Sequence, residues 1–281
     1  MDNPVLHSNE EKAAAAFTKQ SVIFDALYSG NSIVHYKRER VRRHLLQYLK
    51  PGAKVLELNS GTGEDAGWLA QRGFSIHATD ISEGMQAVLN QKIKKQGLEN
   101  KVTSEICSFT ELDRLKNKGP YEAVFSNFAG LNCTGDLDRV LNSFSPLLKP
   151  GGIVTLVILP KFCLWESLLL FKGKFNTAFR RFSRGKGVKA KVEGQFFDCW
   201  YYNPSFISKC LSEEFNLLSV EGLCTFVPPS YIEHFAERYP KTYQWLKKKE
   251  ERHKYGWPWR FIGDYYIISL QKKGGDGSDS F

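Results

Sequence analysis

A regular alternation of short apolar runs and longer amphipathic stretches between residues 54 and 159 constrains the fold of this chain more than any other feature. The apolar runs have the length of strands and lie at 54–58, 74–80, 102–107, 123–126 and 153–159. The stretches that read as helices lie at 64–72, 84–97 and 135–148. Because strands that alternate with helices form a parallel sheet covered on both faces, the pattern predicts a doubly wound, Rossmann-like α/β domain over residues 51–160.

The segments on either side of this core follow other patterns. Residues 1–50 predict an N-terminal helical cap, broken near 28–32, whose second half carries three arginines on its surface: Arg38, Arg42 and Arg43. Residues 161–273 predict two more strands, at 215–224 and 260–270, which lie antiparallel at the sheet edge. Two aromatic insertions, 161–200 and 228–258, are expected to form a lid, and residues 274–281 a flexible tail.

A turn that contains Gly61 and Gly63 joins the first predicted strand to the first helix of the core. Glycine lets the backbone turn tightly against a ligand, and Asp80 stands nineteen residues after Gly61, at the end of the second strand. A carboxylate there accepts hydrogen bonds from both hydroxyls of a ribose, so the segment predicts a nucleoside site. Glu57 inside the first strand, with two more acids opening the helix, disfavours a pyrophosphate and favours a ligand that carries positive charge.

These segments resemble three motifs of the class I S-adenosylmethionine-dependent methyltransferases, of the small-molecule type. The run ELNSGTGEDA at 57–66 resembles motif I, ATDIS at 78–82 resembles motif II, and LLKPGG at 147–152 resembles the turn before the fifth strand. The resemblance covers residues 53 to about 160 in the family's order. It implies a seven-stranded sheet in the order 3-2-1-4-5-7-6 with an antiparallel last strand, S-adenosyl-L-methionine as the cofactor, and methyltransferase activity.

The same resemblance assigns residues to the cofactor. Glu57 would meet the ammonium of the methionine part, Asp80 the ribose and Ile81 one face of the adenine. The sequence departs from the family pattern at Asn59, which replaces a glycine, and at Ser108, where many relatives have an acidic residue near the adenine amino group. The full set of expected cofactor-binding residues is Tyr28, Arg40, Glu57, Asn59, Gly61, Gly63, Asp80, Ile81, Met85, Ser108, Phe109, Asn127 and Phe128.

The methyl acceptor is predicted from the segment after the fourth strand and from the two insertions. Residues 126–133 lack the motif of adenine and glutamine amino-methylases, and Cys133 lacks the Pro-Cys or Thr-Cys context of a cytosine C5 methylase. We therefore expect in-line methyl transfer to an O or N of a small or peptide-sized acceptor that is anionic or hydrophobic. Candidate general bases are His35, Tyr36, Tyr231 and His234. Candidate acceptor-binding residues are Asn132, Trp165, Arg180, Arg181, Trp200 and Tyr231.

The net charge of +9 leaves other classes of partner open. Residues 161–191 carry nine Lys and Arg against one carboxylate, Glu166, and the aromatic residues among them suit an RNA-binding surface. The alternatives are therefore a nucleic-acid (RNA) methyltransferase or RNA-binding protein, and a catalytically silent S-adenosylmethionine-binding protein. The six scattered cysteines and six dispersed histidines predict no metal site. The polar N-terminus and the short apolar runs predict a cytoplasmic protein without a membrane span.

Overall fold

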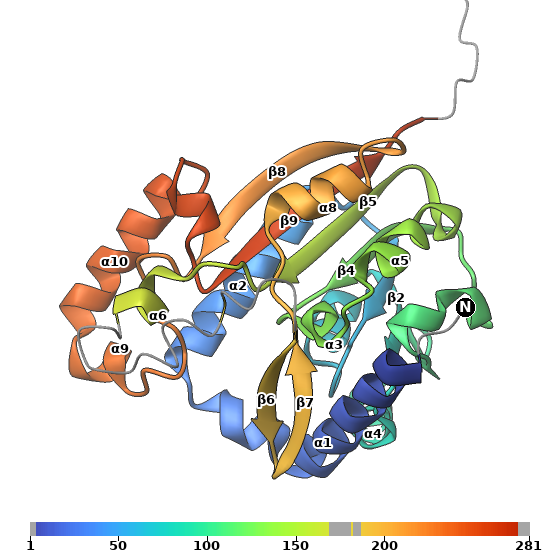
Figure 1. The fold of residues 1–281 in the computed structure, drawn as a ribbon. Coiled ribbons are helices and arrows are strands. Elements are labelled where there is room, and N and C mark those ends of the chain that lie inside the picture. Colours follow the sequence, from blue (N-terminus) through green and yellow to red (C-terminus); the bar gives the residue numbers. More distant parts are fainter. Residues whose placement is uncertain (1–3, 169–180, 182–186, 275–281) are drawn as a thin grey trace, which may run out of the picture.

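The structure, a computed structural model, describes residues 4–168, 181 and 187–274. A seven-stranded sheet in the order β3-β2-β1-β4-β5-β9-β8 runs through it (Figure 1). The strands of this sheet are β1 (Lys54–Leu58), β2 (Ser75–Asp80), β3 (Val102–Ile106), β4 (Tyr121–Ser126), β5 (Leu148–Ile158), β8 (Phe215–Leu223) and β9 (Tyr265–Lys272). The first five pair in parallel, and β9 runs antiparallel to both of its neighbours. The predicted doubly wound sheet, its strand order and its antiparallel last strand are confirmed.

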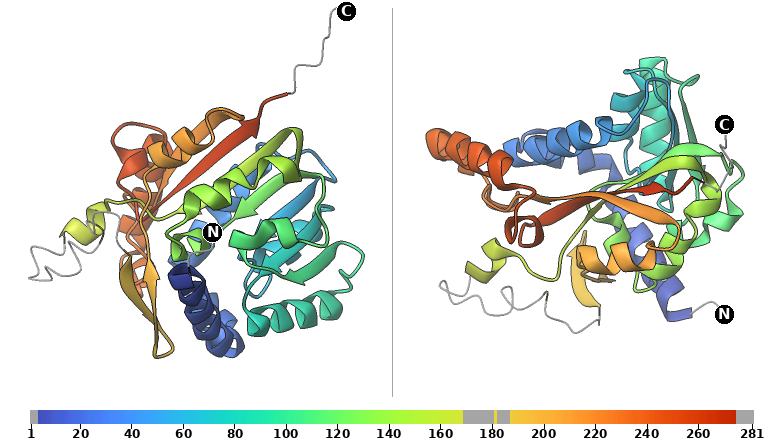
Figure 2. Two further views of the ribbon diagram at one scale, coloured as in Figure 1. Left: turned by 45° about the vertical axis from the view of Figure 1, so that its right-hand side comes forward. Right: turned by 90° about the horizontal axis from the view of Figure 1, so that it is seen from above.

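Side chains of β1 alternate between the two faces of the sheet, and each face has an apolar core of its own. Val55 packs in a cluster with α2, α3 and α4, whereas Leu56 and Leu58 pack in a second cluster with α5 and α8. The helices of the two layers are α2 (Ser32–Leu46), α3 (Glu64–Ala70), α4 (Glu83–Gln96), α5 (Leu137–Asn142) and α8 (Pro204–Cys210). Figure 2 shows helices on both sides of the sheet. A parallel sheet buried on both faces in this way presents its carboxyl edge as the place for a ligand.

Helix α1 (Pro4–Ser29) lies over that carboxyl edge, where it contacts the loops that follow β1 to β4 (Figure 1). Its Thr18 hydroxyl lies 2.8 Å from the hydroxyl of Ser82 after β2, and Asp25 accepts a 2.6 Å hydrogen bond from Thr62 after β1. Gly84 permits this approach, because a Cβ there would lie 2.8 Å from the carbonyl oxygen of Thr18. The predicted break in the N-terminal helical segment falls at Asn31, whose side chain caps α2.

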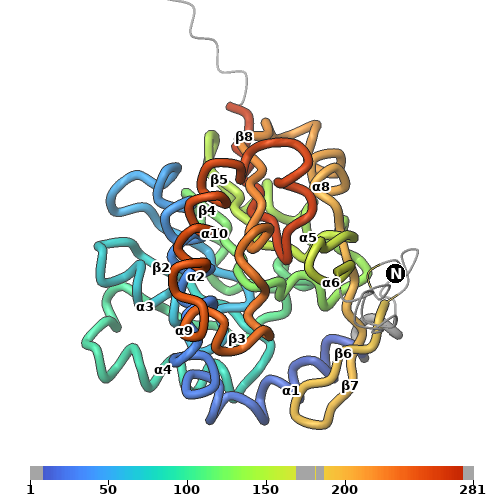
Figure 3. Tube along the Cα trace, turned by 90° about the vertical axis from the view of Figure 1, so that its left-hand side faces the viewer, coloured from blue at the N-terminus to red at the C-terminus, as the bar shows by residue number. Residues whose placement is uncertain are grey.

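The first insertion contains α6 (Leu164–Leu168) and a hairpin, β6 (Val188–Val192) with β7 (Gln195–Cys199), that the sequence pattern does not indicate. The hairpin turns at Glu193 and Gly194, both with positive φ, as a two-residue turn requires. Its Phe197 packs against the alanines of α1, so the hairpin lies beside that helix in Figures 1 and 3.

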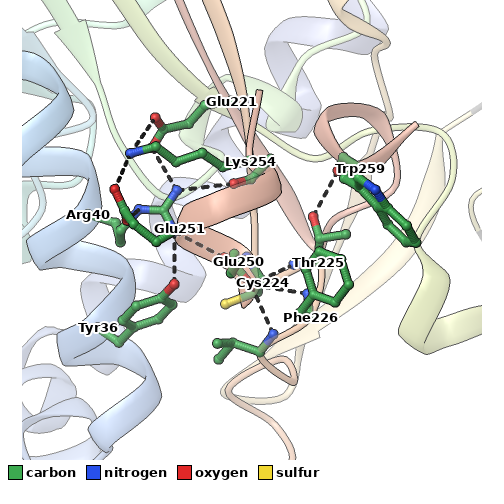
Figure 4. Close-up of polar contacts among 12 residues, drawn as sticks. Tyr36, Arg40, Glu221, Cys224, Thr225, Phe226, Glu250, Glu251, Lys254 and Trp259 are labelled. Carbon is green, nitrogen blue, oxygen red and sulfur yellow. Dashed lines mark hydrogen bonds and ion pairs between the residues drawn. The ribbon is translucent and has the colours of Figure 1, made fainter. Parts of the chain in front are cut away.

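The second insertion forms α9 (Phe235–Arg238) and α10 (Pro240–His253), which pack beside α2. Arg40 of α2 joins them through a buried ion-pair network, the Arg40 network, with Glu221 of β8 at 2.8 Å and Glu250 of α10 at 3.3 Å (Figure 4). Glu250 also accepts hydrogen bonds of 2.7–3.1 Å from four successive backbone N–H groups after β8, those of Cys224, Thr225, Phe226 and Val227. The network therefore fastens α10 and the end of β8 to α2.

Short 3-10 helices complete the fold: η1 (Phe109–Arg114), η2 (Gly130–Cys133), η3 (Ser145–Leu147) and η6 (Trp259–Phe261). Within the described ranges, no helix combines the length and the apolar character that a bilayer crossing requires.

Candidate active site

A pocket opens at the carboxyl ends of β1, β2 and β4, between the sheet and α1. The space between its walls is about 880 Å³, open solvent at the mouth included. Nine of the predicted cofactor residues line it: Glu57, Asn59, Gly61, Asp80, Ile81, Met85, Phe109, Asn127 and Phe128. Residues that the sequence predicts at the ends of different strands thus line one pocket.

The glycine turn positions Asp80. Gly61 has a φ of +54°, and its backbone N–H donates a 2.9 Å hydrogen bond to one Asp80 carboxylate oxygen. The N–H of Ser82 donates to the other oxygen at 2.8 Å, so the carboxylate is fixed in the wall of the pocket. Burial raises the pKa of Asp80, although these backbone donors oppose the shift. Gly63 is not among the residues that line the pocket. A Cβ on Gly63 would lie 2.7 Å from the Leu89 side chain, so the glycine lets α3 and α4 pack closely.

Two buried carboxylates at the pocket, Glu57 and Asp65, have opposite environments. Burial would raise the pKa of Asp65, but Arg38 at 2.8 Å and Arg42 at 2.7 Å, together with the amide of Asn127, hold it below its ordinary value. Burial, and then the charge of Asp65, raise the pKa of Glu57 well above its ordinary value. One Glu57 oxygen, Oε2, is buried and has no hydrogen-bond partner among the described residues. A positively charged donor in the pocket would satisfy that oxygen.

The loop after β4 supplies the other side of the pocket. Phe128 and Ala129 both adopt positive φ, +48° and +61°, an uncommon strain for two successive residues other than glycine. The side chain of Asn127 holds the turn, since it accepts from the Phe128 N–H at 2.8 Å and donates to Asp65. The Phe128 ring lies 4.8 Å below the guanidinium of Arg38, which also lines the pocket.

Arg40 and Tyr28, which we expected at the cofactor, lie elsewhere. Arg40 is fully buried in the Arg40 network, and its Nη1 donates a 2.8 Å hydrogen bond to the hydroxyl of Tyr36. The expectation for Arg40 is therefore corrected, because Arg38 reaches the pocket instead. Side chains two positions apart on a helix point in directions about 200° apart, so Arg38 and Arg40 lie on opposite sides of α2. Tyr28 lies at the exposed end of α1, and Phe24, one turn before it, lines the pocket.

The four candidate bases are not brought to the pocket. Tyr36 is buried beside Arg40, and burial raises the pKa of its hydroxyl above the ordinary tyrosine value. His35 is exposed on α2, with Nε2 2.5 Å from the carbonyl oxygen of Ser29. Tyr231 and His234 are exposed in the second insertion, His234 at the start of α9. None of the four lines the pocket, and Tyr36 packs instead against the second insertion.

The candidate acceptor-binding residues mostly hold the fold. Asn132 bonds the backbone of Leu159 and Trp200, and Trp200 is half-buried against the core. The Trp165 indole donates to the carbonyl oxygen of Thr225. Arg181 is buried between Glu166 and Asp264, at 2.6 and 2.9 Å, and Cys163 lies beside this pair. Arg180 lies outside the described residues.

Twelve pocket residues are outside the predicted set of site residues, and five of them come from α1. They are Glu10, Ala13, Ala14, Phe17, Phe24, Arg38, Ser60, Thr62, Glu64, Asp65, Gly130 and Cys133. The helical pattern of residues 11–50 contains no signal for where that helix docks. Burial raises the pKa of the Cys133 thiol well above its ordinary value, so this residue is poorly suited to act as a nucleophile.

Sequence comparisons agree with this arrangement. Residues 55–152 match the family described as a methyltransferase domain. Demethylmenaquinone methyltransferase of Bacteroides fragilis is 32% identical over 115 residues, which are 40% of this chain and 46% of that protein. The enzyme of the same name from Bacillus cytotoxicus is 29% identical over 150 residues, 52% of this chain and 62% of that protein. The chain thus matches about half the length of these curated relatives.

Solved structures agree on the fold. The 1,6-didemethyltoxoflavin-N1-methyltransferase of Burkholderia thailandensis superposes with a TM-score of 0.57 at 13% identity, covering 97% of this chain and 93% of that one. Phosphoethanolamine N-methyltransferase 2 of Haemonchus contortus superposes with a TM-score of 0.54 at 17% identity, covering 84% of this chain and 52% of that one. The chain is thus similar to methyltransferases through the matched domain at residues 55–152, and the strand order and the glycine turn with Asp80 agree with that similarity.

Proposed function

We propose that this chain transfers the methyl group of S-adenosylmethionine to an O or N of a small acceptor. The observation that carries the proposal is Glu57, which lines a pocket together with Asp80 and has a buried oxygen, Oε2, without a hydrogen-bond partner among the described residues. An ammonium held by Glu57 and a ribose held by Asp80 belong to one nucleoside-amino acid ligand. S-adenosylmethionine supplies the chemistry, a methyl group activated by the positive sulfonium sulfur.

The charge of the pocket supports the same ligand. Among the described residues, the pocket is lined by five carboxylates, those of Glu10, Glu57, Glu64, Asp65 and Asp80, and by one guanidinium, that of Arg38. An anionic pyrophosphate would be repelled there, whereas an ammonium and a sulfonium would be attracted. The residues present therefore fit S-adenosylmethionine better than a dinucleotide.

The protein's part in the reaction is to position the reactants and to exclude water. Methyl transfer is an in-line displacement, which depends on alignment of the acceptor atom with the bond that breaks. Helix α1 covers the pocket with Ala13, Ala14, Phe17 and Phe24, side chains that neither compete as acceptors nor hold water. A pocket covered on this side by apolar side chains suits an acceptor that enters already deprotonated or as a neutral amine.

The acceptor itself is proposed to be largely apolar. Phe24 and Phe128 border the pocket, and its lining guanidinium, on Arg38, already pairs with Asp65. Arg181, our sequence-based candidate for binding an anion, pairs with two carboxylates away from this pocket. Of the two kinds of acceptor expected from the sequence, these contacts support a hydrophobic one more than an anionic one. The small acceptors named for the Bacteroides and Burkholderia proteins are consistent with this proposal.

The test uses labelled S-adenosylmethionine in a host extract, fractionated into small molecules, protein and RNA. We expect radiolabel in the small-molecule fraction and binding of S-adenosylhomocysteine by calorimetry, without comparable affinity for NAD. Label recovered in RNA, with binding that falls steeply with salt, would replace the proposed acceptor by nucleic acid. Tight binding of NAD and none of S-adenosylhomocysteine would overturn the proposal as a whole.

A further inference from the structure

Glu10 is the charged side chain that α1 contributes to the pocket wall, among alanines and phenylalanines of the same helix. The residue is only 3% exposed. An ionised carboxylate is costly to bury in an apolar wall unless hydrogen-bond donors hold it. Its position therefore requires an explanation beyond the packing of α1.

Two hydroxyls hold the Glu10 carboxylate at the end of β3. Ser108 Oγ donates to Glu10 Oε2 at 2.5 Å, and Thr110 Oγ1 donates to the same oxygen at 2.9 Å. Ser108 Oγ in turn accepts from the Thr110 N–H at 3.1 Å, which directs its single proton toward Glu10. A carboxylate accepts about four hydrogen bonds, so these hydroxyls and a ligand can share it.

The start of α1 is fixed independently of any ligand. Asn9 accepts from the Asp198 N–H at 2.6 Å and donates to the carbonyl oxygens of Asp198 and Cys133. These bonds tie α1 to the hairpin β6–β7 and to the loop after β4. The hairpin thereby sets where Glu10 stands along the sheet edge.

Strand order places three carboxylates in a row across this edge. Glu57 lies on β1, Asp80 ends β2, and Glu10 is held by the residues that follow β3, with β3, β2 and β1 adjacent in the sheet. Strands β1 and β3 are two strand spacings, or about 10 Å, apart. An extended ligand with its amino acid part at Glu57 and its ribose at Asp80 would bring its base to Glu10.

The walls at that end suit a flat ring. Ile81 and Phe109 line the same pocket and offer apolar surfaces for the faces of a base, and Glu10 offers acceptor oxygens for its edge. We propose that Glu10 accepts a hydrogen bond from the exocyclic amino group of the adenine, so that α1 supplies the carboxylate that reads the base. This assignment rests on the proposed function.

The experiment compares two ligands that differ only in the amino group: S-adenosylhomocysteine and its 6-deamino analogue, in which purine replaces adenine. Their dissociation constants are measured by calorimetry for the wild type, Glu10→Gln and Glu10→Met. The matched control is Glu11→Gln, the exposed neighbour on the same helix.

We expect the wild type and Glu11→Gln to prefer the amino ligand by roughly 10- to 100-fold, as a hydrogen bond to a charged group would give. Glu10→Gln should reduce that preference to a few-fold, and Glu10→Met should abolish it. If a Glu10 variant weakens the binding of both ligands by the same factor, or leaves the binding of both unchanged, the preference for the amino ligand persists. Glu10 then only anchors α1, and the assignment is overturned. If the wild type binds neither ligand, the proposed function fails and the assignment with it.

Discussion

Two regions of this molecule bury several charges, and they differ in how those charges are paired. In the Arg40 network, Glu250 accepts four backbone N–H groups and contacts Arg40, while Glu221 contacts Arg40, His44 and Lys254. At the pocket, Asp65 is paired with two arginines, but Glu57 Oε2 has neither a hydrogen-bond partner nor an ion-pair partner among the described residues. A buried charge whose partners all come from the protein holds the fold together, whereas one that lacks a partner indicates a ligand.

The largest effect expected from this comparison is on stability, in the Arg40 network. Glu250→Ala removes one of the two buried carboxylates that pair with Arg40 and the acceptor of four N–H groups, so it should lower the free energy of unfolding by about 3–5 kcal/mol. Urea unfolding measures the change, and Lys248→Ala, at an exposed position of the same helix, serves as the control. A loss below about 1 kcal/mol would mean that the network contributes little to the fold.

A smaller effect is expected at the pocket, and on binding instead of stability. Asp80→Ala should weaken the binding of S-adenosylhomocysteine by about 1–3 kcal/mol, because a fixed carboxylate is lost as a hydrogen-bond acceptor. Calorimetry on the folded variant measures this loss. An unchanged affinity would remove Asp80 from the ligand site.

The two regions should also differ in their response to pH. Since burial and Asp65 raise the pKa of Glu57, its ionised form grows as pH rises above the ordinary glutamate pKa of about 4.3. Affinity for a ligand ammonium should therefore rise with pH, by up to tenfold per pH unit, from the ordinary glutamate pKa up to the raised pKa of Glu57. The unliganded fold should change in the opposite sense, because a pKa higher in the folded state costs stability as pH rises through that interval.

Calorimetric titrations across this range check the pH dependence, with Glu57→Gln as the control variant. In that variant the slope assigned to Glu57 should disappear. A slope that persists would assign the pH dependence to another group, such as Asp80, whose pKa burial also raises.

The smallest effect is expected at the surface histidine that sequence reasoning proposed as a base. His35 is exposed and contacts the backbone of Ser29 at the end of α1. His35→Ala should therefore change the free energy of unfolding by no more than about 0.5 kcal/mol and leave kcat within about threefold. A large loss of kcat with unchanged stability would bring His35 back as a base and would require α2 to move toward the pocket.

The parts predictable from the sequence are those fixed by neighbouring residues along the chain. The strand, glycine turn and helix around Gly61 form one local unit, and Asp80 ends the next strand, so spacing alone located them. Glu57 stood out because an acid inside an apolar strand is costly to bury. These residues do meet in one pocket.

The parts that the sequence did not provide depend on where distant segments dock. The pattern of α1 marks a helix but not its neighbours, so Glu10, Phe17 and Phe24 gave no signal. Arg38 and Arg40 differ by two positions on α2, and only the packing of α10 decides which of them faces the pocket. That the two insertions form a lid stays a prediction. The hairpin β6–β7 of the first insertion packs on α1, which covers the pocket, while α9 and α10 of the second insertion pack beside α2.

The unpartnered Glu57 carboxylate is tested most directly by titrating S-adenosylhomocysteine into the wild type and Glu57→Gln, with urea unfolding of both proteins alongside. We predict that Glu57→Gln weakens binding by roughly 10- to 100-fold, because a hydrogen bond to a charged group is lost. The free energy of unfolding should stay the same or rise, since a buried charge without a partner has been removed. Unchanged affinity combined with a loss of stability comparable to that of Glu250→Ala would contradict the account and make Glu57 a structural residue.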